Sequence, residues 1–262
     1  TRAFSAGANL MVILMGSNQG TWEDIRASIA AFQNAVMGLR HSSIPVVAAP
    51  HGLTLGGGAE ICLGANAIQA HAELYMGLVE VGVGLSPGGG GCFGLLYNNQ
   101  GYGPDIDPTV YLRDTFMTIG MAKVATSAEE ARQAGFLLPN DRVTMDRDEL
   151  LFAAKQRALG LARSDFRPPR PRSLKVAGRS GYATLYSALW GMRDTHHISE
   201  HDMTVGLGLS RILSGGDVAA GTVVGEQRFL ELEQEVFLSL CGEEKTRERM
   251  QYMLMNNKPL RN

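Results

Sequence analysis

The sequence has little cysteine. Cys62, Cys92 and Cys241 are the only three among 262 residues, and none forms a CxxC or Cys/His ligand spacing. A disulfide framework and a zinc knuckle are therefore both disfavoured, and we expect reduced thiols in a cytoplasmic protein. The net charge of -2 offers no basic field for nucleic acid. No apolar run reaches the roughly 20 residues that cross a bilayer, so no membrane span is expected.

Charge is also scarce over residues 1–100, although the rest of the chain is densely charged. An unpaired ionised carboxylate loses hydration when it is buried, so each acid in this apolar stretch needs a partner, a proton or a chemical role. Two of the acids lie in apolar sequence beside glycine runs, Glu60 in GGGAE and Glu80 in LVEVGVGLSPGGGG. Two carboxylates with space for water between them could act as an acid and a base. The charged residues of this stretch are Arg2, Glu23, Asp24, Arg26, Arg40, Glu60, Glu73 and Glu80.

The apolar pattern predicts secondary structure for the first part of the chain. Apolar residues recur at steps of three and four over 22–39, behind Thr21, which predicts an amphipathic helix with a Thr21 cap. The β-branched run at 44–49 predicts a strand that is buried on both faces. A glycine loop and a helix at 57–65 follow, and the alternating residues 67–71 predict the next strand.

Prolines and arginines at 167–175 mark the clearest boundary in the chain. We therefore predict a catalytic core at residues 1–166, and a linker with a helical C-terminal region at 167–262. A charged helical pattern covers 127–163, and further helices are expected at 182–192 and 228–255. Glycines at 206–221 indicate an interruption between them.

The glycines at 56–58 could place backbone N–H groups beside a substrate oxygen. A helix that begins there presents unpaired N–H donors, and the missing Cβ atoms allow the backbone to approach a carbonyl. Such donors stabilise an oxygen that becomes negative during reaction. Tight packing between a loop and a helix would require glycine equally well, so the glycine run alone does not decide between the two.

Several motifs in order give the sequence a family resemblance. They are FSAGANL at 4–10, PVVAAPHGLTLGGGAEICLGAN at 45–66, MGLVEVGVGLSPGGGG at 76–91, SAEEARQAGFL at 127–137 and RERMQYMLMNNKPLRN at 247–262. This series resembles the crotonase, or enoyl-CoA hydratase, superfamily, and most closely the C-terminal hydratase part of bacterial multifunctional fatty-acid oxidation proteins. The resemblance implies an α/β fold of ββα repeats with a helical C-terminal extension. It also implies that the N-terminal part of the usual fold is absent before Thr1, and that residues 97–108 are an insertion.

The resemblance also implies roles for individual residues. The catalytic carboxylates are Glu60 and Glu80, the oxyanion hole is formed by the N–H groups of Ala8 and Gly57, and the backbone of Gly88 helps to hold the reacting water. The residues implied for binding coenzyme A are Ala6, Asn9, Leu10 and Lys258, although Asn9 stands where many relatives have Asp. The expected reaction is the addition of water to a 2-enoyl-CoA in fatty-acid β-oxidation, giving a 3-hydroxyacyl-CoA.

This reaction needs no metal or redox cofactor, and coenzyme A enters as part of the acyl-CoA substrate. NAD would be needed only if an upstream 3-hydroxyacyl-CoA dehydrogenase region exists. A homo-oligomer, such as a trimer or a pair of trimers, is expected from the resemblance. The alternatives are an enoyl-CoA isomerase that uses Glu80 alone, and an inactive acyl-CoA-binding or assembly module.

Other signals have plainer interpretations. The HxxEH pattern of His197, Glu200 and His201 could hold zinc, but it lacks an identifiable third ligand, so we predict a solvated helix beginning or turn. The glycines at 82, 84 and 88 do not fit the dinucleotide spacing, because Pro87 occupies the sixth position. Glu73 has no glycine loop beside it and is predicted to lie in a surface turn. The arginines of the linker could meet coenzyme A phosphates, but a solvated connection is the expected role.

Overall fold

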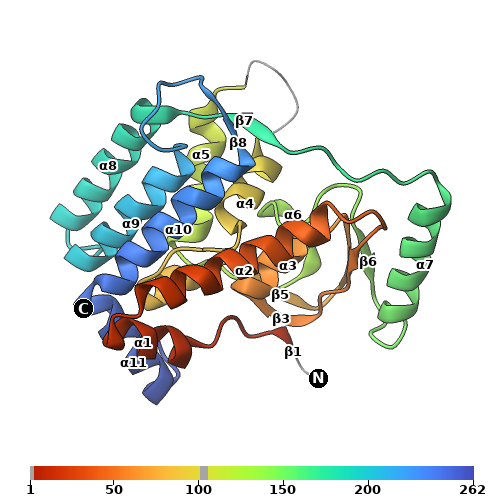
Figure 1. The fold of residues 1–262 in the computed structure, drawn as a ribbon, viewed down its shortest axis with the longest axis horizontal. Coiled ribbons are helices and arrows are strands. Elements are labelled where there is room, and N and C mark those ends of the chain that lie inside the picture. The colour runs from red at the N-terminus through yellow and green to blue at the C-terminus, as the bar shows by residue number, and fades with distance from the viewer. Residues whose placement is uncertain (1–2, 101–105) are drawn as a thin grey trace.

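The computed structural model describes residues 3–100 and 106–262, so most of the predicted insertion is described but its residues 101–105 lie outside this part. Two parallel three-stranded sheets form the first half of the fold (Figure 1). One sheet has the order β1-β3-β5 and the other β2-β4-β6. Their strands are β1 (Ala3–Ser5), β2 (Val47–Ala48), β3 (Gly52–Leu55), β4 (Ala67–His71), β5 (Leu74–Gly77) and β6 (Arg142–Thr144).

The predicted strand–loop–helix unit exists, but with a different strand in it. Residues 44–49 form only the two-residue strand β2, which lies at a sheet edge and is half-buried, so the prediction of a strand buried on both faces is wrong. The strand that leads into the helix is β3, a segment in which the sequence interpretation expected a turn ending at Gly52 and a glycine loop but no strand. Helix α3 (Gly57–Gly64) begins directly after it. The predicted strand at 67–71 is confirmed as β4.

Two further helices belong to the N-terminal half. Helix α2 (Trp22–Arg40) confirms the amphipathic prediction, and it buries Ile25, Ile29 and Val36. The Thr21 side chain makes no capping bond to the first turn; its hydroxyl instead donates to the Gly16 carbonyl oxygen at 3.5 Å. Helix α1 (Leu10–Gln19) precedes α2 and packs beside the last helix, α11 (Glu244–Asn256) (Figure 1).

The charged pattern at 127–163 does not form a continuous helix. Only α6 (Ala128–Gln133) and α7 (Leu150–Arg163) are helical, and strand β6 lies between them. Gly135, with φ of 88°, follows α6, where a left-handed backbone ends the helix. The chain then runs in an extended path from α7 to β7 (Ser173–Lys175), which pairs antiparallel with β8 (Val223–Gly225) (Figure 1).

Helices dominate the remainder of the described chain. The predicted interruption at 206–221 is wrong at its start, because Gly206 and Gly208 lie inside α9 (Glu200–Leu213). A Cβ on Gly206 would approach Leu189 Cδ2 to 2.7 Å, so this glycine allows α9 to pack closely on α8. The helices not yet named are α4 (Gly91–Asn99) and α5 (Pro108–Gly120), which precede α6, and α8 (Gly178–Asp194) and α10 (Glu226–Gly242), which follow β7.

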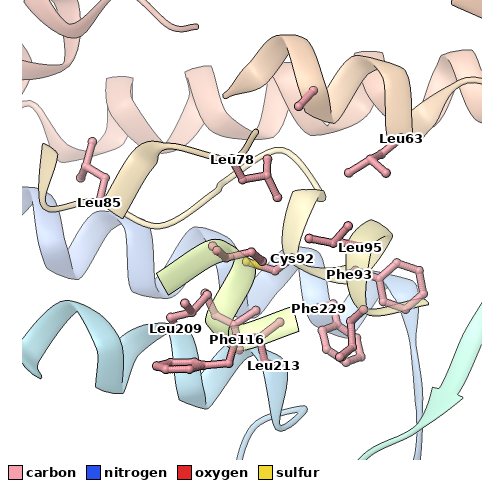
Figure 2. Packing of buried hydrophobic residues seen from close by; sticks show 14 of the residues in the cluster. Leu63, Leu78, Leu85, Cys92, Phe93, Leu95, Phe116, Leu209, Leu213 and Phe229 are labelled. Atoms are coloured by element: carbon pink, nitrogen blue, oxygen red, sulfur yellow. The ribbon is translucent and has the colours of Figure 1, made fainter. Parts of the chain in front are cut away.

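One hydrophobic core joins both parts of the chain. Figure 2 shows Cys92 of α4 between Leu78, which follows β5, and Leu209 of α9. Phe93 of α4 also contacts Phe229 of α10, with ring centroids 5.0 Å apart. The division at residues 166 and 167 stays a prediction, but the core does not stop there. In residues 3–100 and 106–262, no helix is both long and apolar enough to span a membrane.

Candidate active site

Two loops meet where the parallel strands β1 and β3 end. Gly7 has φ of 100° and Gly56 has φ of 54°, so both loops use the left-handed backbone that glycine tolerates. A side-chain carbon on Gly56 would meet Gly7 Cα at 3.6 Å, which shows how closely the loops approach. The Gly56 N–H donates to the Gly77 carbonyl oxygen at 2.9 Å and thereby ties its loop to β5.

The two predicted oxyanion donors lie in these loops. Ala8 is exposed and follows β1, and Gly57 is the first residue of α3. Within the described ranges, no residue accepts a hydrogen bond from either N–H group. Backbone donors at the start of a helix are suited to hold an oxygen that gains negative charge. Their assignment to a substrate oxygen stays a prediction.

Glu60 lies in the first turn of α3 and is 3% exposed. Its Oε1 atom accepts hydrogen bonds from the N–H groups of Gly89 at 2.7 Å and Gly91 at 3.0 Å. Burial raises the pKa of Glu60 to about 6, while the N–H groups of Gly89, Gly91 and Gly88 oppose that rise. Gly88 thus lies at this carboxylate, and its assigned water-holding role stays a prediction.

Glu80 begins the 3-10 helix η1 (Glu80–Val83), just after β5. Its Oε2 atom is closed to solvent, and no described residue forms a hydrogen bond with it. A Cβ on Gly56 would lie 2.9 Å from Glu80 Oε1, so this carboxyl group faces the start of α3. Burial, and secondarily the charge of Glu60, raise the pKa of Glu80 to about 8.

The two acids therefore have unequal surroundings. Glu60 is stabilised as a carboxylate by backbone donors, whereas Glu80 is held as a neutral acid by burial and by its neighbour. Near neutral pH, this arrangement gives one group that can accept a proton and one that can donate a proton. It is the charge distribution that an acid and base pair requires.

A further buried acid beside Glu60, Glu233 of α10, was missed by the sequence interpretation. It is fully buried, and its Oε2 atom accepts from the Gly90 N–H at 2.6 Å. The signal was present, because Leu230, Glu233 and Phe237 share one face of α10 with apolar neighbours. Exposed acids on the same helix concealed it.

The residues assigned to coenzyme A lie at two exposed places. Ala6 and Asn9 lie in the loop after β1, Leu10 begins α1, and the Asn9 side chain caps that helix by accepting from the Met11 N–H at 3.1 Å. Lys258 is exposed and follows α11, which packs against α1. Helix α1 also exposes Met11, Val12 and Met15, which gives an apolar surface beside the loop of Ala8.

The HxxEH residues do not meet at a common point. His201 is buried and its Nε2 atom lies 2.9 Å from Thr246 Oγ1, whereas His197 is exposed and its Nδ1 atom lies 2.8 Å from Thr195 Oγ1. Glu200 and His201 lie at the beginning of α9, as predicted, but His201 is buried, so the prediction that these residues are solvated is wrong for His201. In the described part of the chain, no group of three His, Cys, Asp or Glu side chains has a metal-binding arrangement.

Two other predictions have clear outcomes. Glu73 lies in an exposed bend, as expected. Arg172 differs from the expected solvated linker, because it is buried, paired with Glu226, and stacked 4.8 Å above the Phe93 ring. The three cysteines are free and buried.

Comparisons with known proteins agree with this fold. The chain is 47% identical over 259 residues to a Bacillus subtilis protein named "Probable 3-hydroxyacyl-CoA dehydrogenase". The aligned region covers 99% of this chain and 33% of that protein. It is 29% identical over 247 residues to a Rickettsia felis protein named as a fatty acid oxidation complex trifunctional enzyme, covering 94% of this chain and 31% of that protein. The chain thus spans about a third of these relatives. No family model matches it.

Solved structures share the fold. An enoyl-CoA hydratase from Rhodobacter sphaeroides 2.4.1 superposes with a TM-score of 0.68 at 18% identity, covering 100% of this chain and 76% of that one. An enoyl-CoA hydratase from Bacillus halodurans gives 0.61 at 16% identity, covering 96% and 78%. The architecture is therefore the crotonase-like α/β fold with a helical C-terminal part. This shared fold agrees with the resemblance to the crotonase, or enoyl-CoA hydratase, superfamily that the sequence motifs indicate.

Proposed function

We propose that this chain is an enoyl-CoA hydratase, which adds water across the double bond of a 2-enoyl-CoA thioester. The observation that carries the proposal is a pair of carboxyl groups with unequal partners: Glu60 Oε1 accepts from the N–H groups of Gly89 and Gly91, whereas the solvent-inaccessible Glu80 Oε2 atom has no partner among the described residues. Both acids lie beside the start of α3, next to N–H donors that no described residue uses.

The proposed reaction begins with the thioester carbonyl. The N–H groups of Ala8 and Gly57 hold its oxygen and draw electrons from the double bond, so that C3 becomes electrophilic. Ionised Glu60 removes a proton from water as the water oxygen bonds to C3. The electrons of the double bond move onto the thioester oxygen as an enolate. Neutral Glu80 then protonates C2, and solvent returns the proton from Glu60 to Glu80.

Two acids favour hydration over isomerisation. Moving a double bond requires a proton to leave one carbon and arrive at another, which a single carboxyl group can do. Activating a water while protonating C2 uses a base and an acid together. The backbone donors that favour ionised Glu60 match this division of roles, as does the Glu80 Oε2 atom, which has no such partner among the described residues.

The wider setting follows from the relatives. The names of the Bacillus subtilis and Rickettsia felis proteins support a place for this hydratase in fatty-acid oxidation, within a larger protein that also carries a 3-hydroxyacyl-CoA dehydrogenase. The exposed residues Ala6, Asn9 and Lys258, together with half-buried Leu10, would contact the coenzyme A part of the substrate. We further propose a cytoplasmic homo-oligomer.

Substitution of each acid tests the proposal. Glu60→Gln and Glu80→Gln each remove a proton-transfer group at nearly constant shape, so each should slow hydration of a short 2-enoyl-CoA roughly 100-fold or more. The rate is measured by loss of the enoyl thioester absorbance, with the 3-hydroxyacyl-CoA product identified by mass spectrometry. Exposed Glu73→Gln is the control and should hydrate normally. Near-normal hydration by a folded Glu60→Gln or Glu80→Gln protein would falsify the role given to that acid.

A further inference from the structure

The glycine loop before α4 lies between two buried carboxylates. N–H groups of this loop and of the first turn of α4 donate alternately to Glu60 of α3 and Glu233 of α10. Gly89 and Gly91 donate to Glu60 at 2.7 and 3.0 Å, whereas Gly90 and Phe93 donate to Glu233 at 2.6 and 3.2 Å. The backbone of the loop is therefore held from both sides.

The contacts with α10 extend along one face of that helix. A Cβ on Gly88 would lie 3.0 Å from Phe237, and a Cβ on Gly90 would lie 3.3 Å from Leu230. The buried Gln33 side chain adds a bridge, because its Nε2 donates to the carbonyl oxygens of Gly88 at 2.8 Å and Leu230 at 2.9 Å. Leu230, Glu233 and Phe237 thus form the surface on which the loop rests.

We propose that Glu233 is a positioning residue for Glu60. By holding Gly90 and Phe93, it fixes the rotation of the loop that directs the N–H groups of Gly89 and Gly91 at the Glu60 carboxylate. Glu233 does not touch the reacting atoms. This inference rests on the proposed hydratase function for its kinetic consequences, but the geometry of the loop does not depend on it.

A carboxyl group suits this position because it accepts two backbone donors at once. A buried carboxyl group is costly, and burial raises the pKa of Glu233 well above its ordinary value, with the charge of Glu60 acting in the same direction. An apolar residue would avoid that cost, but it would leave the N–H groups of Gly90 and Phe93 unpaired inside the core. The titratable groups that face Glu233 are Glu60 and the Cys92 thiol.

The substitution Glu233→Gln tests the role, with Glu235→Gln as the matched control. Glu235 lies on the same helix, but it is exposed and pairs with Arg211 and Arg228. In Glu233→Gln, the amide NH₂ group cannot accept the hydrogen bond of one of the two backbone donors, Gly90 or Phe93. The loop should therefore rotate and shift the N–H groups that hold the Glu60 carboxylate. We expect kcat for a short 2-enoyl-CoA to fall on the order of 10- to 100-fold. KM should stay within about threefold, because the proposed thioester contacts lie at Ala8 and Gly57.

Two further measurements separate positioning from a merely structural role. Weaker donation from Gly89 and Gly91 should move the acid limb of the kcat/KM profile to higher pH, because those bonds lower the pKa of Glu60. In ¹H–¹⁵N spectra, the amides of Gly89 and Gly91 should shift in Glu233→Gln and stay in place in Glu235→Gln. Glu233→Asp keeps a carboxylate on a shorter side chain, so it should recover part of the rate.

The outcomes are distinct. A folded Glu233→Gln protein with normal kcat, an unmoved acid limb and unchanged Gly89 and Gly91 amides overturns the proposal. If Glu233→Gln does not fold, the same three measurements on Glu233→Asp decide, with intermediate changes expected. If the unsubstituted chain fails to hydrate the thioester, the hydratase function is rejected. The amide shifts, measured without substrate, then decide the role of Glu233 by themselves.

Discussion

Glu60 is buried and Glu80 is half-buried, and the two acids also differ in their hydrogen-bond partners. Glu60 accepts two backbone N–H groups at its Oε1 atom, while the Glu80 Oε2 atom has no partner in the described part of the chain. Hydrogen bonds to a carboxylate favour its charged form, and burial without them favours the neutral form. The backbone donors of the glycine loop therefore contribute to the difference between the two acids, together with burial and the charge of Glu60, which raise the pKa of Glu80.

This difference predicts the pH dependence of hydration. Glu60 must be ionised, so kcat/KM should rise with pH through its pKa of about 6. Glu80 must be protonated, so kcat/KM should fall as pH passes through its pKa of about 8. A bell-shaped profile between these values is the expected result, measured on the free enzyme at low substrate concentration. A flat profile across this range would contradict the assignment of base and acid.

Gly56 gives a second prediction at the scale of one residue. Alanine here would need φ of 54°, and its Cβ would lie 2.9 Å from Glu80 Oε1. We expect Gly56→Ala to lower the free energy of unfolding by about 1–3 kcal/mol and to slow hydration by displacing Glu80. Urea unfolding and the hydration assay measure the two effects.

Gly82→Ala is the matched control, since Gly82 lies in η1 with nothing within 4 Å of the added Cβ. It should be close to the unsubstituted protein in both assays. Equal behaviour of the two alanine variants would show that the approach of Gly56 to Glu80 is unimportant.

At the scale of elements, helices from the end of the chain support loops from its beginning. Helix α10 packs on α2 and α4, and α11 packs on α1 and η1. The Thr246 hydroxyl of α11 donates to the Gly84 carbonyl oxygen at 2.9 Å, at the end of η1, which Glu80 begins. The C-terminal helices are therefore part of the framework that holds both acids.

The buried pair of Arg172 and Glu226 should be important for this framework. Arg172 Nε donates to Glu226 Oε1 at 3.0 Å, and the guanidinium lies 4.8 and 4.9 Å from the rings of Phe93 and Tyr97. Arg172→Met should lower the free energy of unfolding by about 3–5 kcal/mol, because it leaves the Glu226 charge buried without this partner. Denaturant unfolding measures the change.

Arg170→Met is the control from the same segment. Arg170 is exposed, so its substitution should change the free energy of unfolding by less than about 0.5 kcal/mol. A loss of similar size in both variants would contradict the role of the buried pair.

Element by element, the sequence predicted structure best where a pattern was simple. The period of apolar residues in α2 and the alternation in β4 were sufficient. The glycines of α9 were misread as an interruption, because their role is close packing against Leu189 of α8, which a local pattern does not contain. Strand β3 was missed because it begins at Gly52, and glycine is typical of turns. Gly52 does have φ of 54°, but parallel neighbours on both sides hold the segment as a strand.

At the scale of the whole molecule, the candidate site was only partly predictable. Glu60 and Glu80 were conspicuous because residues 1–100 carry few charges. Glu233 was not, because α10 also carries the exposed acids Glu231 and Glu235, and only the fold shows which acid faces the core. The order of the loops along the chain could be predicted from motifs, whereas the support that α10 gives to them depends on tertiary packing.

Water addition by the whole chain is the central claim, and isotopes test it most directly. The unsubstituted protein is incubated with a short 2-enoyl-CoA in water enriched in ¹⁸O and deuterium, and the thioester product is analysed by mass spectrometry. A hydratase incorporates ¹⁸O at C3 and deuterium at C2, and both labels should be greatly reduced in Glu60→Gln. A product with a moved double bond and no ¹⁸O, or an unchanged substrate, would contradict the account.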